Sequence, residues 1–365
     1  MELRNLQNNI VGQEASRLFA RAEINMGVEA FRDSLYSLLK RNTFLNIKFE
    51  NMLDTLGEIS RTDIRSLLGE WEKTTPLPFY SLGEPTLTKI TNKGGEEFFV
   101  LKMLISNNSD YDGIIHMDIR KDGWWYQPLE DPRAKTKIEM PAHTSKEFVS
   151  VWEDQIRNVE INTMVSGNLP NIISQDINNV KQERNKIVKD SIYILPESSF
   201  DLPGEIIVDN EDSTLFILSA PPIVGLLPKW LDEVEETPFK YSGISWWRPP
   251  LQWTATTNDR YYGKYIRSAF VIKSGDGSQT ATWKVPVPEV GQYDLYYHVF
   301  KDDELRWNNN LQGEYHFKVK YGSEVEDAYV NLRKANEGWE QLGSYYFDSD
   351  TVRVVLTDEC KLRSV

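Results

Sequence analysis

The side chains of this sequence best suited to binding chemistry are aromatic rather than ionisable. Tryptophan and tyrosine gather with one arginine in the last third of the chain, and a further tryptophan follows in a polar segment. These residues are Trp246, Trp247, Arg248, Trp253, Tyr261, Tyr262 and Trp307. Aromatic faces stack on the C–H faces of sugar rings, while an arginine can bond sugar hydroxyls. The cluster therefore predicts a glycan-binding site.

Core packing offers a second interpretation of the same aromatic residues. Adjacent residues of a β-strand point to opposite faces, so Trp246 and Trp247 cannot both enter one pocket. One of them would then fill a core or a seam between domains. The neighbouring pair Trp124 and Trp125 has the same ambiguity. Glycan binding and core packing both stay open from the sequence alone.

The sequence lacks the motif of a catalytic zinc site. A zinc peptidase of the HExxH type needs two histidines at i and i+4 on a helix, with a glutamate between them. No such motif occurs, and the histidines are scattered: His116, His143, His298 and His316. We expect solvent-facing side chains on strands and in a loop rather than metal ligands. We therefore assign no catalytic residue and no metal site to this chain.

Carboxylates are abundant, but their spacing matches no cofactor site. The acidic runs 302–304 and 324–327 are expected between strands, where acidic residues solvate loops. Neither run has the spacing of an EF-hand calcium loop, so calcium stays an unsupported alternative. Motifs for Ser-His-Asp catalysis and for phosphate-binding loops are also absent. The single cysteine, Cys360, predicts a passive strand residue.

Composition narrows the classes of partner. The formal net charge is −14 and the isoelectric point is about 4.9, which argues against nucleic acid and against an anionic membrane surface. No apolar stretch approaches the roughly 20 residues that span a bilayer, and no signal peptide follows Met1. We therefore predict no nucleic-acid partner and no transmembrane segment in this chain.

Hydrophobic periodicity changes along the chain. Apolar residues recur at helical spacing in 25–41, in a second segment that ends near Gly57, and in a third around 64–71. Pro76 and Pro78 then stop the helical pattern. From about residue 84 the period becomes two, which is typical of strands.

The predicted fold class is mainly β, with an N-terminal α-helical subdomain and two β-sandwiches, the C-terminal one resembling a jelly roll. The expected domains are a helical subdomain over 1–78, a β-sandwich over 79–222, a linker over 223–240 and a second β-sandwich over 241–365. The central sandwich is expected to include strands at 204–209 and 214–218 and a polar helix at about 178–190.

The helical segment carries stretches that match a known family. They are residues 27–35 (GVEAFRDSL), 49–53 (FENML), 67–71 (LLGEW) and 76–78 (PLP). This segment resembles the last helices of the catalytic domain of M1-type zinc aminopeptidases, which lead into a β-sandwich. A later run, residues 161–163 and 166–170, resembles the regions that follow such peptidase domains in some bacterial membrane-linked proteins. The resemblance implies a partner domain upstream in the same polypeptide. It places the zinc and its motif before residue 1, so no cofactor is expected here.

The C-terminal segment matches a second family in the order of its strands and turns. The matching residues are Ala281-Thr282-Trp283, Pro288, the stretch 291–296, Tyr315-His316-Phe317, Gly338-Trp339 and Leu342-Gly343. This segment resembles a golvesin C-terminal-like domain, which is also an accessory module of xanthan-lyase-type proteins. The resemblance implies a periplasmic, cell-surface or extracellular protein.

Two functional hypotheses follow. The first is a non-catalytic, C-terminal accessory portion of a larger bacterial envelope protein related to zinc aminopeptidases, in which the β-domains pack against the upstream domain and contact substrate or surface. The alternative is a carbohydrate-binding module that targets its parent enzyme to a polysaccharide or cell-surface glycan.

Overall fold

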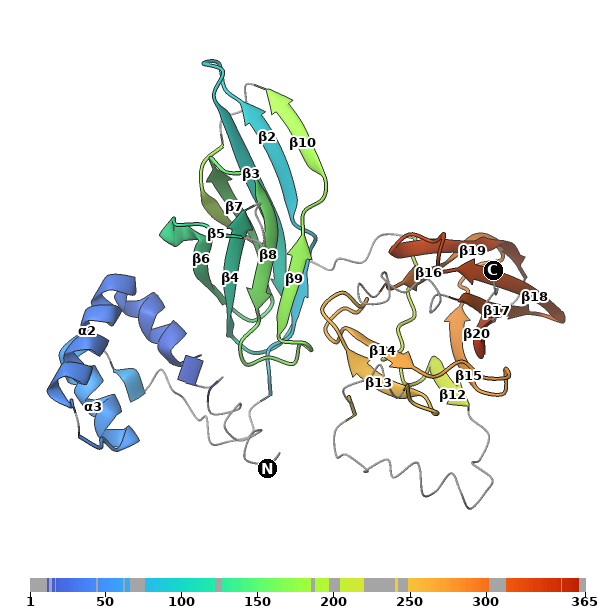
Figure 1. The fold of residues 1–365 in the computed structure, drawn as a ribbon, viewed down its shortest axis with the longest axis horizontal. Helices are drawn as coiled ribbons and strands as arrows, with labels where there is room; N and C mark the ends of the chain where they lie inside the picture. Colours follow the sequence, from blue (N-terminus) through green and yellow to red (C-terminus); the bar gives the residue numbers. More distant parts are fainter. Residues whose placement is uncertain are drawn as a thin grey trace. The chain divides into compact units, whose positions relative to one another are not determined.

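The computed structural model of the chain is shown in Figure 1. It describes residues 12–65 except 13, 14, 17, 44 and 62, and then 76–121, 127–184, 188–196, 204–219, 240–241, 249–301, 313–348 and 350–360. The chain forms two compact units, Met1–Phe200 and Asp201–Val365. Each unit is described by itself below.

The first unit begins with helices, as the periodicity predicted. Helix α2 (Val28–Arg41) follows the helical residues 18–26, and α3 (Phe49–Ser60) comes next. Gly27 has a φ of 82°, a conformation that glycine adopts without strain, and it ends the preceding helical segment. The apolar faces meet in a small core that includes Phe31, Leu38, Leu53 and Leu56. The predicted third helix lies mostly outside the described residues.

A β-sandwich forms the rest of the first unit (Figure 1). Its first sheet has the order β10-β2-β3-β7-β11, with β1 paired to β3. These strands are β1 (Tyr80–Leu82), β2 (Thr86–Thr91), β3 (Glu97–Asn107), β7 (Thr144–Trp152), β10 (Val180–Arg184) and β11 (Ser191–Pro196). The second sheet has the order β5-β4-β8-β9, with β6 paired to β4. Its strands are β4 (Gly113–Lys121), β5 (Gln127–Pro128), β6 (Lys135–Met140), β8 (Ile156–Asn162) and β9 (Ile172–Asp176).

The core of this sandwich follows from alternation along the central strands. Leu101 and Met103 of β3 face Ile115 and Met117 of β4 within one buried cluster. Val100, on the other face of β3, belongs to a separate small cluster. Both faces of β3 thus carry buried apolar side chains.

The segment 178–190 was predicted as a helix, and the structure corrects this. β10 pairs in parallel with β2 at the edge of the first sheet. Its Lys181, Gln182 and Glu183 side chains are exposed. The sequence of this segment has no apolar alternation, so it gives no local signal for a strand. As an edge strand, β10 is held by its backbone pairing with β2 rather than by burial of apolar side chains.

The second unit is also a layered β-domain. A five-stranded sheet has the order β12-β15-β20-β17-β18, and two further sheets pair β16 with β19 and β13 with β14. The strands of the large sheet are β12 (Phe216–Ser219), β15 (Thr280–Pro286), β17 (Glu314–Tyr321), β18 (Glu324–Asn331) and β20 (Thr351–Cys360). The others are β13 (Thr254–Thr257), β14 (Ser268–Val271), β16 (Gly291–Val299) and β19 (Gly338–Phe347). Phe317, Val299 and Phe347 lie in their shared core.

The mainly β fold class with N-terminal helices is confirmed. The strand predicted at 214–218 was assigned to the central domain, whereas β12 pairs with β15 of the second unit. Local alternation predicts that a strand exists but carries no information about its partner. Residues 204–208 form no strand. Most of the predicted linker, 223–240, lies outside the described residues.

Candidate functional site

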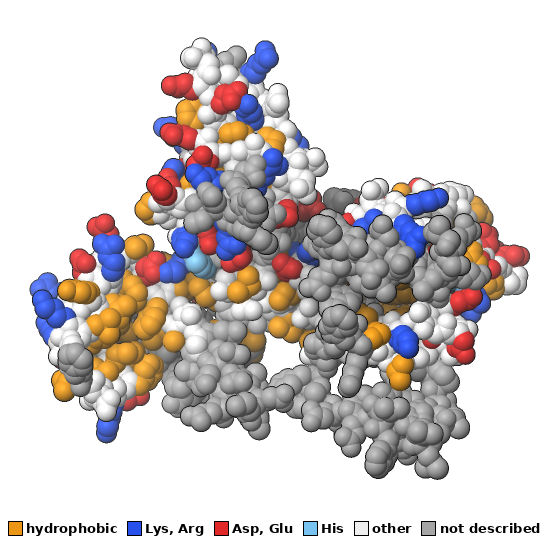
Figure 2. Space-filling model, in the orientation of Figure 1, with side chains coloured by type: hydrophobic (Ala, Val, Ile, Leu, Met, Phe, Trp, Pro, Cys, Tyr) orange, Lys and Arg blue, Asp and Glu red, His pale blue; other side chains and the backbone are white. Residues whose placement is uncertain are grey.

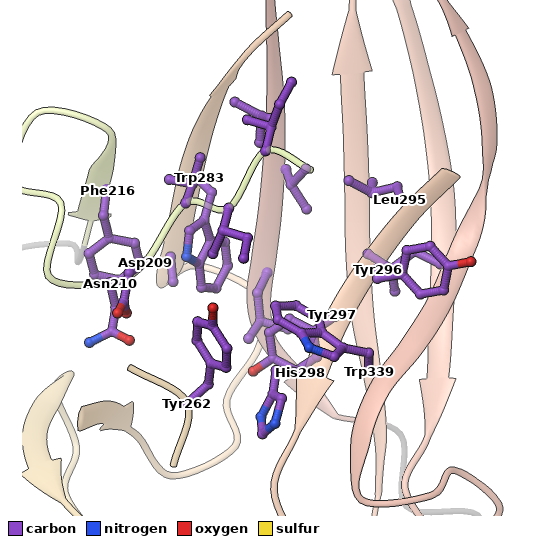
Figure 3. Close-up of a pocket in the computed structure, with 18 of the residues that line it drawn as sticks. Asp209, Asn210, Phe216, Tyr262, Trp283, Leu295, Tyr296, Tyr297, His298 and Trp339 are labelled. Atoms are coloured by element: carbon purple, nitrogen blue, oxygen red, sulfur yellow. The ribbon is translucent and has the colours of Figure 1, made fainter. Parts of the chain in front are cut away.

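A cavity lined by aromatic side chains lies within the second unit. Its volume is about 600 Å³. Trp283 of β15, Tyr293 and Tyr297 of β16, and Tyr315 of β17 form part of its wall. Figure 3 shows Trp283 and Tyr297 among the lining side chains. The alternation of β16 places Tyr293 and Tyr297 on its inner face, toward the core shared with the large sheet. The cavity has the apolar, concave character of a small-molecule site.

Trp253 lines the cavity and has a buried indole N–H. The residue comes just before β13, packs against the core and lines the cavity. Its Nε1 is buried, and no acceptor among the described residues pairs with it. A buried indole N–H normally has a partner, and an unmet one costs about 1–3 kcal/mol.

Tyr261 and Tyr262 reach the cavity from the turn between β13 and β14. The Tyr261 ring meets Phe300 edge-on, with centroids 4.6 Å apart. The centroid of the Tyr262 ring lies 4.9 Å from that of Trp339 and 5.3 Å from that of His298. Figure 3 shows the Tyr262 hydroxyl pointing toward Trp283. The rings of Tyr262, His298 and Trp339 thus form one aromatic corner of the site.

The turn that carries these tyrosines is held in place by two local features. Arg260 Nη2 donates to Glu337 Oε2 at 2.6 Å and its Nε donates to Glu337 Oε1 at 3.1 Å, so the pair is bidentate. Glu337 immediately precedes β19, and the pair therefore ties the turn to the strand that bears Trp339. Gly263 allows the tight path, because a Cβ there would lie 2.0 Å from the Ile266 carbonyl oxygen.

An acidic segment lies at another edge of the cavity. Burial raises the pKa of Asp209 to about 6, although backbone N–H groups of Asn210 and Glu211 partly oppose the shift. The amide of Asn210, oriented to satisfy its neighbours, donates to Asp209 Oδ1 at 2.9 Å. Burial alone would raise the pKa of Glu211, but hydrogen bonds from Lys240, Ser268 and Tyr241 outweigh it and lower the pKa.

Two titratable side chains of β16 that line the cavity, Tyr297 and His298, have pKa values that favour the neutral form at pH 7. Burial lowers the pKa of His298 below its usual value near 6.5. Burial also raises the pKa of Tyr297 far above its ordinary value. Both groups keep their hydrogen-bonding atoms without carrying a charge, which suits recognition of a polar, neutral ligand.

The structure brings together three of the residues that the sequence singled out. Trp253, Tyr261 and Tyr262 all line the cavity. The other predicted site residues are Trp246, Trp247, Arg248 and Trp307, and they lie outside the described residues, as do Trp124 and Trp125. The glycan assignment of the cluster stays a prediction.

Several lining residues were missed by sequence reasoning, among them Asp209, Trp283, His298 and Trp339. Trp283, His298 and Trp339 lie in segments with strand-like alternation, which predicts strands but not which of them face each other. His298 was expected to face solvent, but it is half-buried against Trp339 with centroids 5.2 Å apart. Only the pairing of β16 with β19 brings the two rings together.

The remaining histidines and acidic runs differ in part from expectation. His316 was expected on the solvent side, yet it is buried between Asp327 at 2.6 Å and Glu359 at 3.2 Å. The acidic run 324–327 lies within β18 rather than between strands. The run 302–304 lies outside the described residues. Across the described part of the chain, no three metal-binding side chains form a cluster that could hold an ion.

Comparison with known proteins places the second unit in context. Residues 249–364 match the model of the Golvesin C-terminal domain. This confirms the resemblance noted in the C-terminal sequence. Asp209, Asn210 and Phe216 precede the matched range, so the cavity is lined by residues inside and outside that range.

Solved structures give weaker likenesses. Paenibacillus xanthan lyase is 15% identical, with 79% of this chain and 26% of that chain covered and a TM-score of 0.29. Bacteroides uniformis β-glucuronidase 2, covalently bound to cyclophellitol-6-carboxylate aziridine, is 12% identical, with 83% and 31% covered and a TM-score of 0.18. The chain spans about a quarter to a third of these proteins. Such TM-scores support no structural conclusion.

Two further findings concern the whole sequence and the described helices. No curated protein matches this sequence significantly. Within the described residues, no helix has the length and apolar character needed to cross a membrane. The peptidase resemblance of the helical segment stays a prediction.

Proposed function

We propose that the second unit is a non-catalytic carbohydrate-binding accessory domain of a longer protein that acts outside the cytoplasm. The observation that carries this proposal is the cavity of about 600 Å³ with its corner of Tyr262, His298 and Trp339. Sugar rings have apolar faces and polar edges, which an aromatic wall with a few polar atoms can match.

The donors and acceptors around the cavity support a sugar over a purely apolar ligand. We propose that Trp253 Nε1, which has no acceptor among the described residues, donates to a ring or hydroxyl oxygen of the ligand. His298 and Asp209 add polar atoms to the lining. A wholly apolar ligand would leave these groups unsatisfied at a cost, whereas sugar hydroxyls can donate and accept.

A binding role fits the acidic groups better than hydrolysis does. General acid–base cleavage of a glycosidic bond uses a pair of carboxyl groups whose environments separate their pKa values. Asp209 has a raised pKa, but Glu211 of the same segment is engaged by Lys240, Ser268 and Tyr241. We therefore assign Asp209 to the lining of the site and propose no catalytic residue.

Retention on polysaccharides tests this proposal. The full chain would be run in native gels that contain soluble neutral or acidic polysaccharides, and applied to a glycan array. We expect retardation by at least one polysaccharide, and Trp339→Ala should abolish most of it. Trp339 is 50% exposed, so the change should cost little stability.

Two further variants make the result specific. Trp253→Phe removes the unpartnered N–H but keeps an aromatic ring, so we expect glycan affinity to fall about threefold to tenfold while folding is retained. Tyr193→Ala, an equally exposed tyrosine of the first unit, is the matched control and should bind normally. No retention on any glycan, or equal retention of Trp339→Ala, would contradict the proposal.

The helical segment supports a second accessory role, packing against another domain of the same polypeptide. Figure 2 shows hydrophobic side chains gathered over α2 and α3. Val28, Tyr36 and Leu39 of α2 are 60%, 65% and 62% exposed. Apolar surface of this kind is typical of an interface. We propose an upstream peptidase-like domain as the partner, and tight zinc binding or peptide hydrolysis by this chain alone would refute that role.

A further inference from the structure

The outward face of the β16–β19 pair carries a continuous row of aromatic and polar side chains. The antiparallel register places them as four facing pairs, which are Gln292 with Tyr346, Asp294 with Ser344, Tyr296 with Gln341, and His298 with Trp339. We call these eight residues the β16–β19 face. Residues of the opposite parity, such as Tyr293 and Leu295, pack against the core instead.

Three aromatic rings on this face are open to solvent. Tyr346 is 61% exposed, Trp339 is 50% exposed and Tyr296 is 47% exposed. Figure 3 shows the ring of Tyr296 pointing away from Tyr297. Trp339 and Tyr346 lie at opposite ends of β19, roughly 20 Å apart at the usual rise per residue of a strand. That distance is several times the width of one sugar ring.

Polar side chains between the rings are held in fixed positions. Ser344 donates a hydrogen bond to Asp294, and Gln341 Nε2 donates to Asp294 Oδ1 at 3.2 Å. Among the described residues, no hydrogen bond engages the side-chain carbonyl oxygen of Gln341 or the Oδ2 of Asp294. Ordered acceptors between aromatic rings match the hydroxyl-lined edge of a sugar chain.

The face is continuous with the cavity. His298 and Trp339 form its last pair and also line the cavity, where Tyr262 contacts both rings. A ligand seated at this corner can therefore extend along the strands without leaving the protein surface. The exposed row and the cavity thus share one end.

We propose that the β16–β19 face extends the cavity site and binds several consecutive sugar rings of an extended, electrically neutral polysaccharide chain. The inference rests on the proposed function, since it takes the cavity corner as the place where one sugar ring binds. It adds the class of ligand, which is an internal stretch of a long neutral chain rather than a free monosaccharide or a polyuronate.

The charge of the β16–β19 face favours a neutral polysaccharide over an acidic one. The eight residues of the face include no lysine or arginine, and Asp294 lies near the middle of the row. A uronate at that position would face a carboxylate with no cation on the face to offset the repulsion. A neutral chain meets no such penalty.

Calorimetric titration of the full chain with oligosaccharides tests the inference. The probes are the monomer to the hexamer of the cello-, manno-, xylo- and galacturono- series. We expect at least one neutral hexamer to bind about tenfold or more tightly than its monomer, and the galacturonate hexamer to bind more weakly. Tyr346→Ala should lower hexamer affinity about fivefold to tenfold and leave monomer affinity unchanged.

The outcomes separate this inference from the proposed function. Equal affinity for monomer and hexamer, with Tyr346→Ala like the parent, would overturn the extended site and leave the cavity site standing. Binding of no probe would overturn both. Preference for the galacturonate hexamer would overturn the neutral assignment. Self-association in sedimentation that Tyr346→Ala abolishes would show that a second copy covers this face. Tyr193→Ala is the control and should match the parent throughout.

Discussion

Asp209 shows how a single side chain couples the cavity to pH. Its carboxyl is half-buried among apolar and aromatic neighbours, which raises its pKa to about 6 from a usual value near 3.8. The folded state therefore holds this proton more tightly than the unfolded state does. Between about pH 4 and pH 6 the folded chain therefore binds more protons at this site than the unfolded chain does. The free energy of unfolding must fall as pH rises through this window.

Asp209→Asn should remove this dependence. At pH 7.5 the variant avoids a half-buried charge, so we expect its free energy of unfolding to exceed that of the parent by about 1–2 kcal/mol. At pH 4 and below the difference should shrink toward zero, because the parent carboxyl is then protonated. Urea unfolding at both pH values measures it, with Glu205→Gln, an exposed neighbour, as the control. If the two proteins differed in free energy of unfolding by the same amount at both pH values, the raised pKa of Asp209 would be contradicted.

At the scale of elements, one buried asparagine side chain holds strand β1 of the first unit in place. Asn168 is buried and pairs with β1 through its side chain. Its Oδ1 accepts from the Tyr80 N–H at 2.9 Å and its Nδ2 donates to the Tyr80 carbonyl at 2.8 Å. The amide thus supplies the bonds that a neighbouring strand would otherwise make.

Asn168→Asp keeps the acceptor but replaces the donor with a carboxylate oxygen that faces the Tyr80 carbonyl. We expect the free energy of unfolding of the first unit to fall by about 2–4 kcal/mol, from an unmet buried carbonyl and a buried charge. Thermal or urea unfolding measures the change. Asn178→Asp, at an exposed position, should stay within about 0.5 kcal/mol of the parent. A loss of similar size in both variants would argue against the role of Asn168.

The turn at Gly263 should control the site more than the stability of the domain. In Gly263→Ala the new Cβ would press on the Ile266 carbonyl, so the turn must shift and carry Tyr261 and Tyr262 with it. We expect a loss of about 1–3 kcal/mol in stability and a clear loss of glycan retention. Gly291→Ala, where the nearest atom would be 3.9 Å away, should retain binding. Unchanged retention by Gly263→Ala would separate the turn from the site.

At the scale of the whole molecule, two units with separate cores predict two unfolding transitions. Phe317 is fully buried in the second unit and Leu101 in the first. Each substitution to alanine should cost about 2–5 kcal/mol and lower only the transition of its own unit in calorimetry. A glycan ligand should raise only the transition that Phe317→Ala lowers. If either variant lowers both transitions equally, the units unfold as one.

The sequence alone determined the fold class, the helical start and the presence of an aromatic cluster. Those features depend on local properties: the period of apolar residues, proline and glycine positions, and residue type. Trp253, Tyr261 and Tyr262 could be selected because they are close in sequence, and they line one cavity.

Only the tertiary structure decided which distant strands meet. Trp339 joins His298 through the pairing of β19 with β16, and β12 brings Phe216 to β15 of the second unit. Strand pairing is set by long-range packing and hydrogen bonds that leave no local signature. The raised pKa of Asp209 and the unmet donor of Trp253 likewise arise from burial, which a residue acquires only when the chain has folded.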